Sequence, residues 1–281
     1  MRSSNPVFAR SEGFNGRASG MTYPSYDAPP ATQHSSRGGF DAPPPYTQAP
    51  VDTGRMTIDS VVQKTGITLG TTIVVAAATW FLTGPIDNEA ALRGLYTLSI
   101  TGALIGFVLA MVNSFKKVVS PGLVLAYAAV EGVFIGAFSK SLEAMVGDGL
   151  VFGAVLGTFA AVAGTLAAYK FFNIQVSNRF RKWTIAALFG FVAVSLFDFV
   201  LGLFGHAIGV NGFGGLGLVM SFIGLGLGVL MLILDFDFVE RGIAAGLPER
   251  ESWRAAFGLT VTIIWIYIEL LRILAILRGQ E

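Results

Sequence analysis

Long apolar stretches that carry almost no charge constrain this chain more than any other feature of its sequence. Seven of them follow residue 55, each close to the roughly 20 residues that an α-helix needs to cross a bilayer core. They lie at residues 65–86, 94–115, 121–140, 149–169, 183–203, 213–235 and 255–277. Of all residues, 53% are hydrophobic and only 13% are charged, a composition typical of integral membrane proteins. We therefore predict an all-α, polytopic membrane domain of seven transmembrane helices over residues 56–281.

The first 55 residues have a different composition from the rest of the chain. Eight of the 11 prolines lie within residues 1–50, where the segment 26–30 (YDAPP) is loosely repeated at 40–46 (FDAPPPY). Such a segment buries too little apolar surface to offset the entropy lost on ordering. We predict a disordered, proline-rich cytoplasmic tail with polyproline II character. Residues 43–46 (PPPY) resemble a ligand of WW domains, although a solvated tail without such a partner is the favoured interpretation.

Lysine and arginine are distributed unequally between the two sides of the predicted bundle. If the spans alternate in direction, 15 of the 19 basic residues fall on the side that holds the N-terminus and four fall on the other. Basic residues are enriched in cytoplasmic loops, so the N-terminus is predicted to be cytoplasmic and the C-terminus to lie outside. The net charge of +1 gives no indication of nucleic-acid binding.

Acidic residues within or at the ends of the apolar spans are the candidate functional residues. A carboxylate in the bilayer costs about 2.5–3.5 kcal/mol on insertion scales, so it usually faces the bundle interior and marks an ion or proton path. Asp235 ends the sixth span and shares one helix face with Gly217, Ser221, Gly224 and Gly228. Small residues of this kind let membrane helices approach closely. We therefore expect Asp235 to face inward.

The rise of an α-helix converts sequence position into depth within the membrane. Glu131, Asp198 and Glu269 each lie about 21–24 Å from the basic side, which predicts one acidic layer in the outer half of the bilayer core. Asp235 lies only about 9 Å from that side and forms an inner layer. Arg272 follows Glu269 by one turn on the same face, so the two can pair, either as a structural ion pair or as part of a pore.

Other residues near Asp235 complete the predicted site. Asp237 lies about 200° further round the helix, so we expect it at the rim or in the turn, as a solvated end residue. Folding of the connection 242–253 would bring Thr262 to the height of Asp235. Oxygen ligands suit hard cations such as calcium, and Asp235 and Asp198 are the candidate metal ligands. We expect no cofactor beyond a transported or bound calcium ion.

The order of these elements resembles that of the Bax inhibitor-1 family of seven-helix membrane proteins. The strongest match is the sixth span, which ends at Asp235 and is followed by Glu240 and Arg241. A short basic connection then leads to a last helix that carries the sequence Leu-Leu-Arg at 270–272. The resemblance covers residues 56–281 and suggests a divergent bacterial branch, which implies a location in the bacterial cytoplasmic membrane.

The resemblance also implies a function and a site. Members of this family are implicated in calcium leak across membranes, with a pair of acids on helices six and seven that acts as a pH-sensitive latch. Asp235 matches the first acid, but Thr262 stands where many members carry a second aspartate. The latch of this chain is therefore absent, rebuilt with Asp237, or moved to Glu269.

We expect a pH-responsive cation leak channel, with calcium as the favoured ion. Cations would pass Glu131, Asp198 and Glu269 and be held by Asp235 at the cytoplasmic gate. One alternative is a non-conducting regulator or scaffold, whose acids hold the bundle together while the tail recruits cytoplasmic or membrane proteins. A proton-coupled exchanger is a second alternative, although the hydropathy shows no convincing inverted repeat. The partners expected in every case are the lipid bilayer and inorganic cations.

Enzymatic functions are disfavoured by the residues that the spans lack. The sequence contains no cysteine, which excludes thiolate nucleophiles and sulfur metal sites. It has no intramembrane serine–histidine pair of the rhomboid type and no Gly-x-Gly-Asp sequence of the presenilin type. The last span also lacks the lysine that a retinal protein needs. We therefore expect a protein that is not an enzyme.

Overall fold

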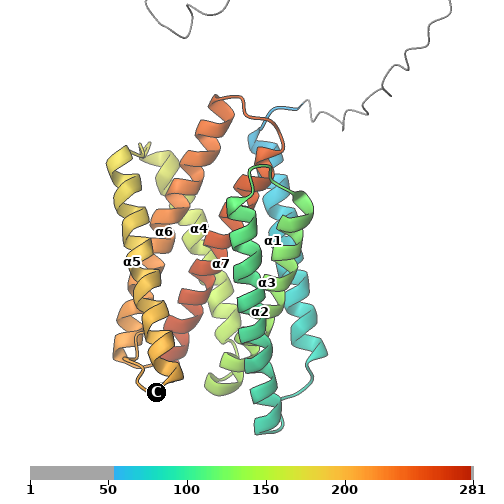
Figure 1. The fold of residues 1–281 in the computed structure, drawn as a ribbon, viewed down its shortest axis with the longest axis vertical. Helices are drawn as coiled ribbons and strands as arrows, with labels where there is room; N and C mark the ends of the chain where they lie inside the picture. Colours follow the sequence, from blue (N-terminus) through green and yellow to red (C-terminus); the bar gives the residue numbers. More distant parts are fainter. Residues whose placement is uncertain (1–53, 280–281) are drawn as a thin grey trace, which may run out of the picture. The chain divides into compact units, whose positions relative to one another are not determined.

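The computed structural model describes residues 54–279, which form an all-α bundle of seven helices (Figure 1). Each helix is long and apolar enough to cross a membrane. The helices are α1 (Ile58–Leu82), α2 (Glu89–Phe115), α3 (Pro121–Val146), α4 (Leu150–Phe171), α5 (Asn178–Leu203), α6 (Gly215–Ala244) and α7 (Glu251–Arg278). The predicted fold class is therefore confirmed. The predicted disordered tail and the motif at 43–46 lie outside the described residues.

Polar residues just before the apolar spans determine where several helices begin. Thr57 and Ser60 form a reciprocal capping box at the start of α1, and the side chain of Asn88 accepts a hydrogen bond from Ala91 N at the start of α2. Ser177 caps α5 in the same way, whereas α3 begins with Pro121 in its first turn. Such caps satisfy backbone N–H groups that have no partner within the helix. The helices thus extend beyond the uncharged stretches into polar sequence.

The last helix, α7, lies at the centre of the bundle. Its most apolar stretch is 67% buried, whereas that of α5 is 11% buried. The backbone of α7 packs against α1, α3, α4 and α6, while α2 packs only against α3 and α5 only against α6. In Figure 1, α5 and α6 lie on one side of α7, and α1, α2 and α3 lie on the other. Because α7 holds these groups together, its polar residues are shielded from lipid.

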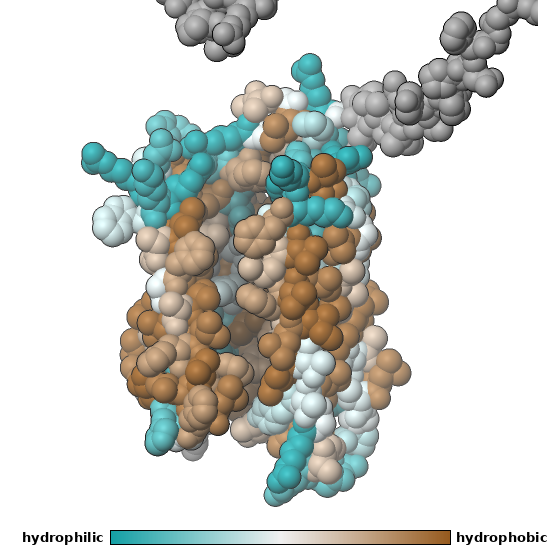
Figure 2. Space-filling model, viewed as in Figure 1, coloured by the Kyte–Doolittle hydropathy of each residue, from teal (hydrophilic) through white to brown (hydrophobic). Residues whose placement is uncertain are grey.

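Apolar packing around α7 forms most of the core. Four clusters of buried hydrophobic residues occur in the described part of the chain, and α7 contributes to three of them. Its Leu271 packs with Leu142 of α3 and Leu150 of α4, while its Ile266 packs with Leu232 of α6. In Figure 2, hydrophobic residues cover the middle of the bundle and hydrophilic residues gather at its two ends. This distribution is typical of a protein that spans a bilayer.

Small residues allow α1 and α3 to cross at close range. A Cβ atom added at Gly132 would lie 2.6 Å from the carbonyl oxygen of Thr72, and one added at Gly136 would lie 2.5 Å from that of Ala76. These two glycines are four residues apart and therefore share one face of α3. They form a small-residue contact of the kind that supports helix association in lipid.

A short extended segment before α1 ties the α6–α7 connection to the rest of the bundle. Met56 N donates to Leu247 O over 2.8 Å, and Glu249 N donates to Gly54 O over 2.9 Å. Lys64 of α1 forms an ion pair with Glu249 at 2.9 Å. We call this end of the bundle, which also carries the connections 116–120 and 172–177, the basic end.

Candidate functional site

Asp235 of α6 faces the central helix α7. The hydroxyl group of Thr262 donates a hydrogen bond of 2.6 Å to Asp235 Oδ2. Gly258 lies one turn earlier on α7, and a Cβ atom there would be 3.3 Å from Asp235 Oδ1. The sequence predicted both the inward direction of Asp235 and the height of Thr262. Thr262, which the resemblance aligns with a second acid, is therefore in direct contact with Asp235.

Asp235 also lines an open pocket at the basic end. The pocket has a volume of about 440 Å³ and lies between α5 and α6. Its lining includes two arginines, Arg181 and Arg241, and apolar side chains such as Ile185, Met231 and Phe238. Asp235 thus has α7 on one side and an opening on the other.

The prediction that Asp237 is a solvated end residue is wrong. The helix α6 does not end near residue 235 but continues to Ala244, and Asp237 is only 6% exposed. Its carboxylate accepts hydrogen bonds from Arg181 Nη2 at 2.7 Å and from Arg241 Nε at 2.8 Å. Two guanidinium groups compensate for the burial of the charge. Asp237 therefore joins α5 to α6, and neither of its bonds is to Asp235.

Sequence reasoning missed the role of Arg181 and Arg241. Arg241 follows Asp237 by four residues on one helix, and this spacing is a recognisable pairing signal. Arg241 Nη2 also donates to Val176 O over 2.8 Å, so this arginine fixes the connection before α5. Arg181 comes from a different helix. No periodicity within α6 could identify it.

Glu269 of α7 is buried against α6 and pairs with Arg272. The distance between Arg272 Nη1 and Glu269 Oε2 is 3.4 Å, and both side chains are largely shielded from solvent. Glu269 fits because the facing residue is Gly224, where a Cβ atom would lie 2.6 Å from Glu269 Oε1. The indole N–H of Trp265 donates to Gly224 O over 2.9 Å. The predicted pairing within α7 is present, and it lies at the interface with the small-residue face of α6.

Glu131 of α3 faces α2 rather than the α6–α7 interface. A Cβ atom added at Gly106 of α2 would lie 2.6 Å from Glu131 Oε2, so this glycine makes room for the carboxyl group. Within residues 54–279, the Glu131 carboxyl group has no protein hydrogen-bond or ion-pair partner. Glu131 therefore lies at the contact between α2 and α3. Glu269, with which it was predicted to share a layer, lies at the contact between α6 and α7.

Asp198 of α5 was predicted to line an ion path, but its carboxylate binds the backbone of the next loop. Its carboxylate accepts backbone hydrogen bonds from Ile208 N at 2.6 Å, Gly209 N at 3.0 Å and Asn211 N at 2.8 Å. These bonds fix the connection between α5 and α6, and they leave Asp198 turned toward that loop. Glu131, Asp198 and Glu269, which were predicted to lie at one depth, thus face three different surroundings and are not brought together around one path.

The two candidate metal ligands are too far apart to bind one ion. Asp198 lies five residues before the end of α5, about 8 Å along the helix, whereas Asp235 lies 20 residues after the start of α6, about 30 Å along. Calcium–oxygen distances are about 2.3–2.6 Å. In the described part of the chain no group of three or more His, Cys, Asp or Glu residues could hold a metal ion. Asp235 and Asp198 therefore cannot share one ion, and each could contribute only to a separate site.

Comparison with known proteins places this arrangement in a family. The chain is 28% identical over 159 residues to an uncharacterized protein of Chlamydia muridarum. The match covers 55% of this chain and 64% of that protein, so the chain spans less than two thirds of its relative. The family model described as Bax inhibitor 1 like matches residues 5–279. The resemblance seen in the sequence is thus confirmed, and the chain belongs to the Bax inhibitor-1-like family of membrane proteins.

Proposed function

We propose that the protein is a gated leak pathway for cations, with calcium as the favoured ion, and that Asp235 is the group that attracts the ion. The observation that supports this proposal is the double environment of Asp235. Its carboxyl group is held by Thr262 of the central helix and also lines the pocket of about 440 Å³ at the basic end. A carboxyl group at such a depth in a membrane protein usually serves an ion or proton path.

In this proposal the structure corresponds to a closed arrangement. The polar contacts across α6 and α7 are made through small residues: Gly258 opposite Asp235, and Gly224 opposite Glu269. Small residues let the two helices approach closely, so their polar side chains meet directly at this interface. Opening would separate α6 from α7 and expose both carboxylates along one interface. The proposed path therefore follows α6 and α7 and does not include Asp198, whose oxygens are engaged by backbone N–H groups.

The proposed pH response follows from the charge of Asp235. An ionised carboxylate attracts a cation, whereas a protonated one does not, so acidification is expected to lower the flux through this site. The Thr262 hydroxyl can donate to a carboxyl oxygen in either protonation state. Protonation would therefore remove the charge without breaking the contact between α6 and α7.

We further propose that the basic end faces the cytoplasm of a bacterial cell. Fifteen of the 19 basic residues belong to this end or to the sequence before α1, and basic residues are enriched in cytoplasmic loops. The pocket beside Asp235 would then be the cytoplasmic mouth of the path. The proposed activity is transport and requires no catalytic residue.

A flux assay tests the proposal. The full-length protein is reconstituted in calcium-loaded liposomes, and calcium release is compared between the wild type, Asp235→Asn and the control Asp87→Asn. Asp87 is an exposed acid in the connection between α1 and α2, and its substitution changes the charge equally. We expect release to fall several-fold in Asp235→Asn alone. Equal rates for all three proteins, or a rate that does not change between pH 6 and pH 8, would contradict the proposal.

A second candidate is a non-conducting regulator or scaffold. It is favoured by the contacts of the buried acids, because Asp198 fixes a loop and Asp237 joins two helices. A scaffold would act through proteins bound by the sequence before α1. Crosslinking partners that disappear on deletion of residues 1–50, together with calcium release equal to that of protein-free liposomes, would support this candidate over the leak.

A further inference from the structure

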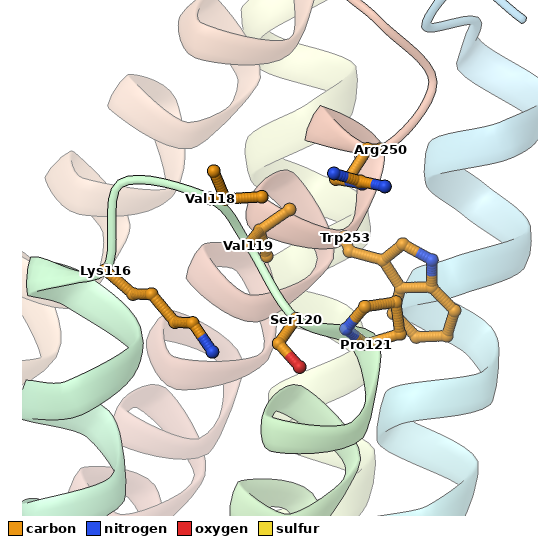
Figure 3. Close-up of a pocket in the computed structure, with 7 residues that line it drawn as sticks. All are labelled: Lys116, Val118, Val119, Ser120, Pro121, Arg250 and Trp253. Carbon is orange, nitrogen blue, oxygen red and sulfur yellow. The ribbon is translucent and has the colours of Figure 1, made fainter. Parts of the chain in front are cut away.

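A second pocket lies at the basic end, on the opposite side of α7 from Asp235. It has a volume of about 360 Å³ and lies between the α2–α3 connection and the start of α7. Its lining comprises Lys116, Val118, Val119, Ser120, Pro121, Arg250 and Trp253. In Figure 3, Lys116 extends into the hollow from one side and the guanidinium group of Arg250 lies on the other, with Ser120 between them and below. Two cations and a hydroxyl group thus surround one small space.

The two cations of this pocket carry charge that the protein does not neutralise. Neither Lys116 nor Arg250 has an ion-pair partner among residues 54–279, and both side chains belong to exposed residues. The nearby acids are committed elsewhere, since Glu249 pairs with Lys64 and Glu251 pairs with Arg254. The region therefore has an excess of positive charge and attracts an anion.

The residue before α3, Ser120, adds one hydrogen-bond donor to the same space, its side-chain hydroxyl group. The side chain of Ser120 makes no capping bond to α3, although serine at this position usually does. The residue that follows is Pro121, which has no N–H group, and the first turn of α3 leaves its partial positive charge directed at the pocket. Ser120 is consequently available to donate to a ligand.

The surroundings of the pocket indicate where the anion comes from. The pocket lies where α2 ends at Phe115 and α3 and α7 begin, which is the level of a membrane surface. Phe115 and Val118 are 78% and 54% exposed, so an apolar surface adjoins the two cations. Trp253 forms part of the wall, and tryptophan is enriched at the boundary between lipid and water. A charged group attached to a hydrocarbon chain matches this combination.

We propose that this pocket binds the phosphate group of an anionic phospholipid. Lys116 and Arg250 contact the phosphate from opposite sides, Ser120 donates a hydrogen bond to it, and an acyl chain lies along Val118 and Phe115. Because Arg250 directly precedes α7, the lipid joins the central helix to the α2–α3 connection. This site is independent of the proposed cation path and contains none of its residues.

Native mass spectrometry of the full-length protein tests this site. The protein is titrated with phosphatidylglycerol or with phosphatidylcholine, as wild type, as Lys116→Gln/Arg250→Gln and as the control Lys170→Gln/Arg179→Gln. The control removes the same charge from exposed residues that also lie at the basic end. Loss of two direct charge-assisted contacts to the phosphate should weaken the binding of phosphatidylglycerol on the order of tenfold or more in the first double variant. The control should retain wild-type binding, and phosphatidylcholine should bind weakly to all three proteins.

Three outcomes would overturn the assignment. Wild-type affinity of Lys116→Gln/Arg250→Gln for phosphatidylglycerol would show that the pocket does not hold the lipid. An equal loss in both double variants would show only general attraction by the basic end. Displacement of the lipid by glycerol phosphate at a comparable concentration would assign the pocket to a soluble phosphate. Because the substituted residues are exposed, the unfolding temperature without lipid should be the same for all variants. A double variant with a lowered unfolding temperature would be left out of the comparison. The single substitution Arg250→Gln would then take its place.

Discussion

Asp235 and Asp237 lie two residues apart on one helix and have opposite surroundings. Asp237 faces α5, where two arginines compensate its charge at 2.7 and 2.8 Å. Asp235 faces α7, where its carboxylate accepts a hydrogen bond of 2.6 Å from the neutral hydroxyl group of Thr262. Within the described residues no cation forms an ion pair with Asp235. Asp237, whose charge is matched by two arginines, holds the fold, whereas Asp235, whose charge is not matched, is the acid that we propose binds an ion.

The largest expected effect is on the free energy of unfolding, which should fall more when Asp237 is replaced than when Asp235 is replaced. Asp237→Ala leaves the guanidinium groups of Arg181 and Arg241 without their common partner, and removal of one member of a buried ion pair is strongly destabilising. Because both arginines are partly exposed, we expect a loss of about 2 kcal/mol rather than the full penalty. Asp235→Ala should lower the free energy of unfolding by less, because it removes a buried carboxyl group that has no ion-pair partner.

Tryptophan fluorescence during denaturation in detergent micelles measures this difference. The two alanine variants differ in position by two residues of the same helix, so each serves as the control for the other. Equal losses of unfolding free energy would mean that the arginines do not stabilise the fold through Asp237, and the contrast between the two acids would disappear.

Some of this contrast could be predicted from the sequence, because it depends on position along a helix. Helix rise and rotation predicted that Asp235 faces inward at the height of Thr262, and spacing along α7 predicted the pairing of Glu269 with Arg272. The seven apolar stretches predicted the fold class for the same reason. Each of these inferences uses only the geometry of one helix or the order of spans.

The other features depend on which helices are neighbours and on how loops fold. The helix that Glu131 faces could not be predicted, because lateral packing is not encoded in the rise of a single helix. Asp198 is held by backbone groups of residues 208–211, whose loop conformation includes Gly209 at a φ of 95°. No side-chain pattern signals such a bond. Asp237 was misjudged because the end of α6 was inferred from hydropathy, whereas the helix continues through charged residues to Ala244.

A second aspartate at position 262 would give Asp235 an ionisable partner. In Thr262→Asp the two carboxyl groups lie within hydrogen-bond reach, and they cannot both be ionised without repulsion. The folded protein then retains a shared proton that the unfolded chain releases. Folded protein therefore binds more protons, and stability falls as pH rises, by up to about 1.4 kcal/mol per pH unit for one proton.

Unfolding measured from pH 5 to pH 8 tests this expectation against Thr262→Asn, which has the same size and no charge. The slope for Thr262→Asp should be steeper than that for Thr262→Asn or for the wild type. If Asp235 controls the leak, calcium release should also depend more steeply on pH in Thr262→Asp than in Thr262→Asn or the wild type. Identical slopes for Thr262→Asp and Thr262→Asn would mean that the two side chains do not meet.

Arg181 links the two acids, because it pairs with Asp237 and also lines the pocket of Asp235. In Arg181→Gln, Asp237 retains Arg241, so the expected loss of stability is only about 1 kcal/mol. A positive charge is removed from the mouth of the proposed path at the same time, and cation release should rise about two- to threefold at low ionic strength. Arg179→Gln is the matched control, since Arg179 is exposed and does not line the pocket. An equal rise in both variants would attribute the effect to net charge rather than to the pocket.

The smallest effect is expected from Thr262→Val, which removes the hydroxyl group while it keeps the shape of the side chain. Loss of a hydrogen bond usually costs about 0.5–1.5 kcal/mol, and more if the partner is left buried without water. Asp235 adjoins an open pocket, so water can replace the hydroxyl group and the cost should stay below about 1 kcal/mol. Thr71→Val is the control, because Thr71 is exposed and bonds only to Ile67 O of its own helix. A cost of several kcal/mol would mean that Asp235 is sealed from water. Asp235 would then hold the fold as Asp237 does, and it could not serve an ion.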